Sequence, residues 1–209
     1  MVTVTTWSRV EVAERVTAAE YWEQAPEDQK AELINGVMVV APAPLDIHEK
    51  LFGFLFSVLR DYAEEHDLGE VRGSRTGVEL AQEEVYQPDI LFVAHDRLGI
   101  IERKGLVGAP DFVIEILSAG TASYDRGDKL RTYERAGVRE LWLIDPYGPA
   151  GTEFYHLIEG RYLPVAPDAQ GVLRSIAVPG FLIDVTWLWP AGRFITVRQA
   201  LARIESPPA

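Results

Sequence analysis

Residues 111–117 constrain the fold most strongly, because they form an almost unbroken run of large apolar side chains. Such a run is typical of a strand that is buried on both faces of a sheet. Glu115 interrupts the run, and an ionised carboxylate without a partner would cost several kcal/mol at such a position. The side chain of Glu115 must therefore be neutral, paired with a cation or bound to a metal ion.

The chain is 209 residues long, which is enough for a hydrophobic core, and we expect residues 1–209 to form a single domain. It contains no cysteine, so a metal ion would need carboxylates, carbonyls or histidines as ligands. The chain shows no secretory leader and no apolar run of membrane-spanning length. We therefore expect a cytoplasmic protein that does not enter a membrane.

The formal net charge of −12 disfavours a protein that coats nucleic acid, because phosphate binding normally depends on lysine and arginine. It does not exclude a nuclease whose basic residues are local, or one whose acidic site is covered by a metal ion.

The order of helical and strand patterns predicts one α/β domain with a mixed sheet. Asn35-Gly36 between two apolar segments indicates a hairpin turn, and Thr17-Ala18-Ala19-Glu20 matches a helix capping box. A helix between strands 111–117 and 140–145 makes these strands parallel neighbours. The expected helices are a short one ending before Pro26, then 46–65, 123–136 and 196–205. The other expected strands are 31–34, 37–40, 71–80, 90–93, 152–158, 161–165, 173–178 and 181–183.

Four acidic residues stand at unusual positions. Asp89 and Asp111 each follow a proline at the start of a strand, Glu115 lies within a strand, and Glu32 precedes the apolar part of the hairpin. Carboxylates that converge at strand ends repel one another unless a cation lies between them. Mg²⁺ suits such a site, because it prefers oxygen ligands and keeps waters for a substrate phosphate.

Lys129 is the candidate cation of the protein itself. On the expected helix 123–136, Asp125, Lys129 and Tyr133 share one side at four-residue spacing. This helix must pack on the sheet that carries Glu115. An ammonium group near a metal-bound water or a phosphoryl oxygen would orient the nucleophile and offset negative charge in the transition state.

Three of these acidic residues also have a purely structural interpretation. Asp89 can be an ordinary turn residue, Asp111 can simply start its strand, and Glu115 can belong to a salt bridge. Asp111 and Glu115 would lie about 13 Å apart along one strand, too far to share an ion, whereas Asp89 approaches from another strand.

The other candidates have structural interpretations as well. Lys129 can be a solvated helix residue, and His48 can be a capping or surface histidine. Trp187 and Trp189 are most simply explained as core or interface aromatics.

Several segments together resemble a known family, the Uma-type family of restriction-endonuclease-like proteins, which is placed in the PD-(D/E)xK nuclease superfamily. The resemblance runs in order from about residue 17 to about residue 190. The segments that carry it are Tyr21-Trp22, Glu32-Leu33-Ile34-Asn35-Gly36, Ala41-Pro42 with His48, Gln87-Pro88-Asp89-Ile90, residues 109–118, Asp125-Arg126-Gly127-Asp128-Lys129, Tyr133 and residues 136–146.

The resemblance implies a restriction endonuclease-like core, a mixed β-sheet flanked by helices, between a short N-terminal extension and a C-terminal tail. It implies that Asp89 and Glu115 are ligands of Mg²⁺, for which Mn²⁺ can substitute. The backbone carbonyl of Ile116 would be a further ligand. Glu32 would complete the site from the N-terminal part of the chain.

The lysine of the superfamily belongs two residues after the glutamate, where this chain has Leu117. The resemblance implies that the family has moved the lysine to the following helix, where Lys129 stands. Gln87, Tyr133 and His48 also match family positions and are candidates to line the site.

These observations lead to three hypotheses. The first is a Mg²⁺-dependent endonuclease that acts on DNA as a homodimer, with Trp187 and Trp189 in the dimer interface. The second is a binding or assembly module that keeps the fold without catalysis, motivated by the net charge and by Leu117. The third, a glycosidase with paired carboxylates, is the least supported, because no aromatic platform for a sugar lies near these acids in the sequence.

Overall fold

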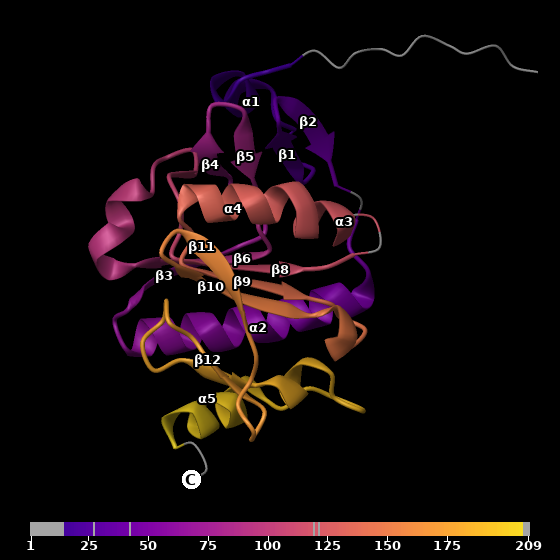
Figure 1. Ribbon diagram of the computed structural model, residues 1–209, viewed down its shortest axis with the longest axis vertical. Helices are drawn as coiled ribbons and strands as arrows, with labels where there is room; N and C mark the ends of the chain where they lie inside the picture. The colour runs from indigo at the N-terminus through magenta and orange to yellow at the C-terminus, as the bar shows by residue number, and fades with distance from the viewer. Residues whose placement is uncertain (1–14, 27, 42, 119, 121, 207–209) are drawn as a thin grey trace, which may run out of the picture.

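The computed structural model describes residues 15–206, except residues 27, 42, 119 and 121. The molecule is a stack of layers, in which a central sheet lies between helices and a second sheet lies beyond one of those helices (Figure 1). This mixed α/β architecture confirms the fold class expected from the sequence. Most of the expected N-terminal extension and the end of the C-terminal tail lie outside the described residues. The single domain 1–209 stays a prediction.

The central sheet has six strands in the order β11-β10-β9-β8-β6-β3. Strands β8 and β9 are parallel, as expected for two strands joined by a helical crossover, and the other neighbours are antiparallel. Strand β8 is buried over its whole length, which confirms the interpretation of its apolar run. The strands are β3 (Gly69–Gly73), β6 (Ile90–Ala94), β8 (Phe112–Ile116), β9 (Glu140–Ile144), β10 (Glu153–Ile158) and β11 (Arg161–Val165).

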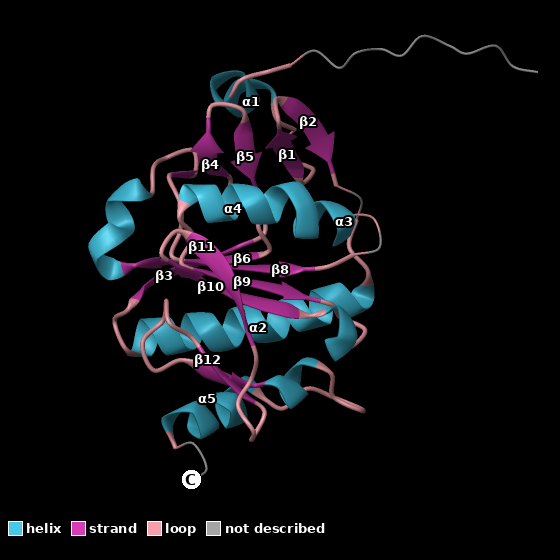
Figure 2. Ribbon diagram, viewed as in Figure 1, coloured by secondary structure: helices cyan, strands magenta, loops and turns pink. Residues whose placement is uncertain are grey.

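Two helices, α2 (Asp46–Glu65) and α4 (Leu130–Ala136), cover opposite faces of the central sheet (Figure 2). Successive residues of β8 point to opposite faces, so Ile114 joins the apolar cluster of α2, whereas Val113 joins Tyr133 of α4. The helix that apolar spacing predicts for residues 46–65 is confirmed, and its first and last residues are those of α2. Glu115, which has the same parity as Val113, therefore faces α4.

A second sheet has five strands in the order β2-β1-β5-β4-β7 and lies on the α4 side of the central sheet (Figure 1). Its hairpin turns at Asn35 and Gly36, whose positive φ angles of 47° and 76° suit a tight turn between twisted strands. Helix α1 (Ala18–Gln24) begins with the expected capping box. The strands are β1 (Ala31–Ile34), β2 (Val37–Val40), β4 (Val78–Ala81), β5 (Glu84–Tyr86) and β7 (Leu106–Val107).

The C-terminal segments lie next to α2, and α5 (Val197–Glu205) packs on it (Figure 1). Strands β12 (Val172–Arg174) and β13 (Leu182–Asp184) form a small antiparallel sheet. Short 3-10 helices occur at η1 (His95–Ile100), η3 (Pro149–Gly151) and η4 (Val185–Leu188). Within the described residues, no helix is long and apolar enough to span a membrane.

A single strand over residues 71–80, bent or bulged at Gly73 and Gly77, was predicted, and this is wrong because the segment forms two strands. The chain turns after Gly73, where its carbonyl accepts from the backbone N–H of Thr76, and the two halves enter different sheets as β3 and β4. Strand β5 was not expected from the sequence. The strand predicted for residues 173–178 ends at Arg174, because the following backbone N–H groups bind a buried carboxylate instead of a strand.

The helix predicted for residues 123–136 is present but irregular. It consists of α3 (Ala122–Tyr124), one π-helical segment η2 (Asp125–Lys129) and α4. A π segment widens one turn of a helix, and such segments are frequent at functional sites.

The interpretation of Trp187 as an interface aromatic is wrong, because its side chain is buried in the core beside α2. Trp189 is partly buried, and its indole N–H donates to the backbone oxygen of Asp145 at 2.8 Å. The two side chains therefore stabilise the C-terminal segments.

Candidate active site

The ends of strands β6 and β8 bring Asp89 and Glu115 together. The antiparallel register pairs Ile90 with Ile114 and Leu91 with Val113. Continued by one residue, the register places Asp89 directly opposite Glu115, and such residues share one face of a sheet. Both acidic residues are only 3% exposed.

Asp89 has three polar partners. Lys30 Nζ lies 2.8 Å from Oδ1, and the backbone N–H of Ile116 donates to Oδ2 at 2.8 Å. His48 Nε2 lies 3.2 Å from Oδ2. Burial opposes ionisation of Asp89, but Lys30 and His48 outweigh it and hold the pKa of this carboxyl well below its usual range. Asp89 is therefore ionised.

Glu115 is held from the α4 side. The hydroxyl of Tyr133 donates to Oε1 at 2.7 Å, and Lys129 Nζ lies 2.6 Å from the same oxygen. Burial raises the pKa of Glu115 to about 7 although Lys129 lowers it, and the negative charges of Asp125 and Asp89 raise it further. The pKa of Glu115 therefore lies close to neutral pH.

Lys129 is the centre of the cluster on this side. Its side chain is 3% exposed, and its Nζ also lies 3.0 Å from Glu32 Oε1 and 3.4 Å from Asp125 Oδ1. Burial disfavours the ammonium form, but the charges of Glu115 and Glu32 raise the pKa of Lys129 well above its ordinary value. The face of the Tyr86 ring lies 5.5 Å from this ammonium.

Glu32 connects the two sheets at the site. It comes from β1 of the second sheet, and its Oε1 accepts from Lys129 and from the backbone N–H of Gln87 at 2.8 Å. Gln87 is buried as well, and its side-chain Oε1 has no hydrogen-bond partner among the described residues. The structure thus brings Gln87, Tyr133 and His48 to the acidic cluster.

Asp111 is not part of this cluster. Its Oδ1 accepts from Arg97 at 2.8 Å, and its Oδ2 accepts from the backbone N–H of Ala94 at 2.9 Å. Asp111 precedes the first residue of β8, whereas Glu115 lies near the last. The carboxylate of Asp111 fastens η1 and β6 to the start of β8.

Lys30 is a site residue that the sequence interpretation missed. It stands two residues before Glu32, so both side chains project to the same side of β1 and its approach. The two-residue spacing indicates that Lys30 and Glu32 share one side. It identifies Lys30 as a site residue only when the hairpin is known to lie beside β6.

The charges of the cluster fit a divalent cation. When ionised, Glu32, Asp89, Glu115 and Asp125 carry four negative charges, and two lysines, 30 and 129, carry two positive ones. Mg²⁺ prefers oxygen ligands. The carboxylate oxygens and the amide oxygen of Gln87, which accepts no hydrogen bond among the described residues, are ligands of this kind.

The arrangement in this structure is not a preformed metal site. Among the described residues, no group of three or more histidine, aspartate or glutamate side chains is placed to hold a metal ion. Asp89 is instead engaged by Lys30 and His48. The oxygen ligands therefore fit Mg²⁺ in their chemistry, and binding at Asp89 requires that it exchange partners.

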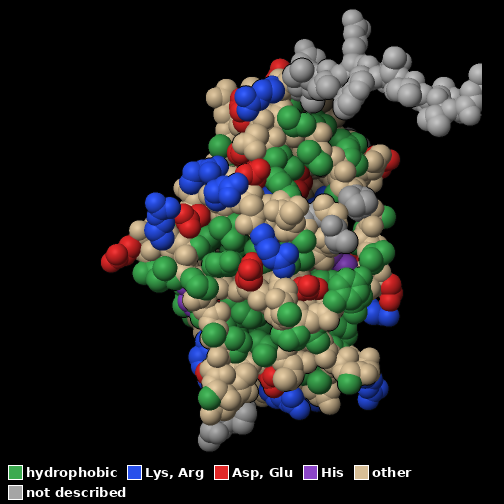
Figure 3. Space-filling model, turned by 45° about the vertical axis from the view of Figure 1, so that its right-hand side comes forward, with side chains coloured by type: hydrophobic (Ala, Val, Ile, Leu, Met, Phe, Trp, Pro, Cys, Tyr) green, Lys and Arg blue, Asp and Glu red, His purple; other side chains and the backbone are tan. Residues whose placement is uncertain are grey.

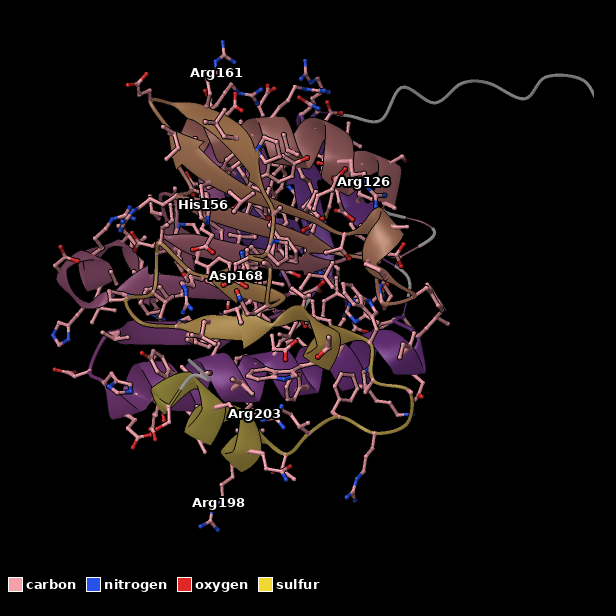
Figure 4. The ribbon with its side chains drawn as sticks, turned by 60° about the horizontal axis from the view of Figure 1, so that its bottom comes forward. Arg126, His156, Arg161, Asp168, Arg198 and Arg203 are labelled. Carbon is pink, nitrogen blue, oxygen red and sulfur yellow. The ribbon has the colours of Figure 1, made fainter. Side chains whose placement is uncertain are left out.

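On the face drawn in Figure 3, basic side chains do not form one continuous surface. Acidic and basic side chains lie next to each other on the face seen in Figure 3. Arg161 of β11 and Arg198 of α5 point away from opposite sides of the molecule (Figure 4).

Comparisons with known proteins show a family and a solved structure of similar fold. The model of the family described as "Uma2: Putative restriction endonuclease" matches residues 18–186. A crystal structure from Anabaena variabilis ATCC 29413, described as "a putative nuclease belonging to DUF820", superposes with a TM-score of 0.64 at 18% identity. The match covers 90% of this chain and 99% of that one. No curated protein matches the sequence.

Proposed function

The chain belongs to the Uma2 family, and from this membership and its buried acidic cluster we propose that it is a Mg²⁺-dependent endonuclease that hydrolyses phosphodiester bonds of DNA. The observation that carries the proposal is the juxtaposition of Asp89 and Glu115 at adjacent strand ends, with Lys129 2.6 Å from Glu115. We further propose that it works as a cytoplasmic homodimer.

In this proposal Asp89 and Glu115 hold the metal, together with the backbone carbonyl of Ile116. The ion, when bound, acts as a Lewis acid on the phosphate and lowers the pKa of a water molecule. Glu32, whose Oε1 accepts from Lys129, would complete the site from β1. Mn²⁺ would substitute for Mg²⁺, because both accept oxygen ligands.

In this proposal Lys129 takes the role of the superfamily lysine, whose usual position is Leu117 in this chain. Its ammonium is fixed by three carboxylates, so it would meet the attacking water and the phosphoryl oxygens without reorganising. Tyr133 and Asp125 are positioning residues in this scheme, since Tyr133 fixes Glu115 and Asp125 lies one turn before Lys129.

The test is cleavage of supercoiled plasmid and of branched DNA in the presence of Mg²⁺ or of a chelator. We expect cleavage by the wild type with metal only, and at least a hundredfold slower cleavage by Glu115→Ala. The control is Glu102→Ala, which removes an exposed glutamate and should leave the rate unchanged. Equal, metal-independent background for the wild type and Glu115→Ala would refute the proposal.

One observation favours the second candidate function, a non-catalytic binding module. Asp89 already has Lys30, His48 and the N–H of Ile116 as partners, so its charge is compensated without a metal. A calorimetric titration separates the two candidates, because a non-catalytic module would bind Mn²⁺ no better than a surface carboxylate does. A tight site that Asp89→Asn abolishes would exclude it.

A further inference from the structure

We propose that Lys30 is an exchangeable counter-ion, which neutralises Asp89 in the metal-free protein and gives this carboxylate up when a divalent cation binds. The inference rests on the proposed metal-dependent function and concerns how a divalent cation binds at the same site. The lysine would make the acidic site stable without metal and would set the metal concentration at which the site fills.

The contacts of Asp89 require such an exchange. Lys30 occupies Oδ1 at 2.8 Å, while His48 and the N–H of Ile116 share Oδ2. The carboxylate is buried, so two cations at one of its oxygens would repel each other with little screening by water. A divalent ion at Asp89 therefore displaces the ammonium of Lys30.

Lys30 is the more exposed of the two lysines at the site. Its side chain is 24% exposed, whereas that of Lys129 is 3% exposed and enclosed by three carboxylates. The backbone of Lys30 is fixed, because its carbonyl accepts from the N–H of Ala41 at 2.8 Å. Rotation of the long side chain alone would release Asp89 toward solvent.

The exchange has a quantitative consequence. When the binding-competent state is only a fraction of the population, the apparent affinity for the ligand falls by that fraction. The ion pair between Lys30 and Asp89 reduces the fraction of protein whose Asp89 is open. The wild type should thus bind the metal ion more weakly than the same site would bind it without the ion pair between Lys30 and Asp89.

The test is a calorimetric titration of the full chain with Mn²⁺ alone, without DNA. We expect Lys30→Met to bind Mn²⁺ about tenfold more tightly than the wild type, on the order of one partly buried ion pair. The matched control is Lys50→Met, which removes the same charge from the exposed side of α2 and should change the affinity less than twofold.

The outcomes separate this inference from the proposed function. If the wild type binds Mn²⁺ and Lys30→Met binds equally or more weakly, the role of Lys30 is refuted while the metal site stands. If neither protein binds Mn²⁺, the proposed function fails and the inference fails with it. Binding by Lys30→Met alone would support the inference, since it would show that the lysine had blocked the site.

A second measurement guards against misfolding. Without metal, Lys30→Met should melt at a lower temperature than the wild type, because Asp89 has lost its main counter-charge. Saturating Mn²⁺ should then raise its melting temperature by more than it raises that of the wild type. If Lys30→Met does not fold, Lys30→Gln removes the charge while it keeps a hydrogen-bond donor. An equal rise for variant and wild type would contradict the exchange.

Discussion

Glu115 is the buried carboxylate whose ionisation affects both the stability of the site and the metal binding that we propose for it. Its burial opposes ionisation, whereas the positive charges of Lys129 and, more weakly, of Lys30 favour the carboxylate. The result is an acid with a pKa of about 7, close to the pH at which a metal ligand must be ionised. Protons and metal ions should therefore compete for Glu115 near neutral pH.

The raised pKa of Glu115 predicts a pH dependence of stability. Between its ordinary value of 4.5 and about 7, the folded protein binds a proton that the unfolded chain has lost. The stabilisation is complete below the lower value and is lost as the pH rises, by up to about 1.4 kcal/mol per pH unit. Glu115→Gln should remove this part of the slope in urea titrations of the metal-free protein from about pH 5 to about pH 7. Parallel profiles for wild type and variant would contradict the prediction.

Lys129 should be the most costly lysine to remove. Lys129→Met leaves Glu115, Glu32 and Asp125 around an apolar side chain, and the loss of one partner from a buried ion pair typically costs about 3–5 kcal/mol. Chemical denaturation at pH 7 should show this loss, and acid should reduce it, because protonated carboxylates repel less. Lys50→Met is the exposed control, for which we expect a change near zero. A loss that is independent of pH would argue against the electrostatic explanation.

Among the elements, the predictions succeeded where a local pattern decides the structure. The hairpin at Asn35-Gly36, the capping box of α1 and the apolar stripe of α2 are each specified by residues close in sequence. The prediction failed for residues 71–80, since an apolar pattern cannot reveal that a turn sends its two halves to different sheets.

The candidate site shows the same division. Asp89 and Glu115 stood out because their types conflict with buried strand positions, and Lys129 stood out through its helical spacing. Lys30 was missed as a site residue, because it reaches the site through a contact with Asp89, which lies 59 residues away in the sequence. The π segment that carries Lys129 was also missed, since no local residue pattern distinguishes it from a regular helix turn.

Glu140 fastens the C-terminal segment to the central sheet. It is fully buried at the start of β9, where Oε1 accepts from the indole N–H of Trp142 at 2.8 Å. Its Oε2 accepts from the hydroxyl of Ser175 at 2.6 Å and from the backbone N–H groups of Ile176 and Ala177. This carboxylate replaces the strand pairing that the sequence pattern had suggested for residues 175–178.

Glu140→Ala should therefore unfold the chain more readily, by about 3 kcal/mol, because four donors, two of them in buried hydrogen bonds, lose their acceptor. Equilibrium denaturation measures the loss, and Glu102→Ala is the exposed control. Hydrogen exchange should additionally speed up at Ile176 and Ala177. A loss under about 1 kcal/mol would show that water replaces the carboxylate at these groups.

In the molecule as a whole, the candidate site lies where the two sheets meet. Glu32 and Lys30 come from β1 and its approach in the second sheet, whereas Asp89 and Glu115 belong to the ends of strands in the central sheet. A ligand bound here would connect both sheets. Its binding energy would therefore stabilise the entire fold and not one loop.

The homodimer expected from the sequence needs a different surface, since Trp187 is buried. Strand β2 is an outer strand of its sheet, and Val39, Val40 and the neighbouring Leu45 are 43%, 46% and 62% exposed. Natural edge strands are normally protected by charge or proline, and Val37–Val40 contains neither. We therefore expect two copies to meet at β2 with twofold symmetry, which would suit a duplex with two strands to cut.

Light scattering tests this arrangement, because the dimer should have about twice the chain mass of 23.3 kDa at micromolar concentration. Val39→Lys should shift the mass toward the monomer, since a charge at the centre of the edge opposes pairing. Val107→Lys is the matched control, because Val107 is 44% exposed on β7 at the opposite edge of the same sheet. A monomeric wild type would rule out the dimer. A dimer that resists Val39→Lys but yields to Val107→Lys would move the interface to β7, on the far side of the sheet from Lys30 and its hairpin.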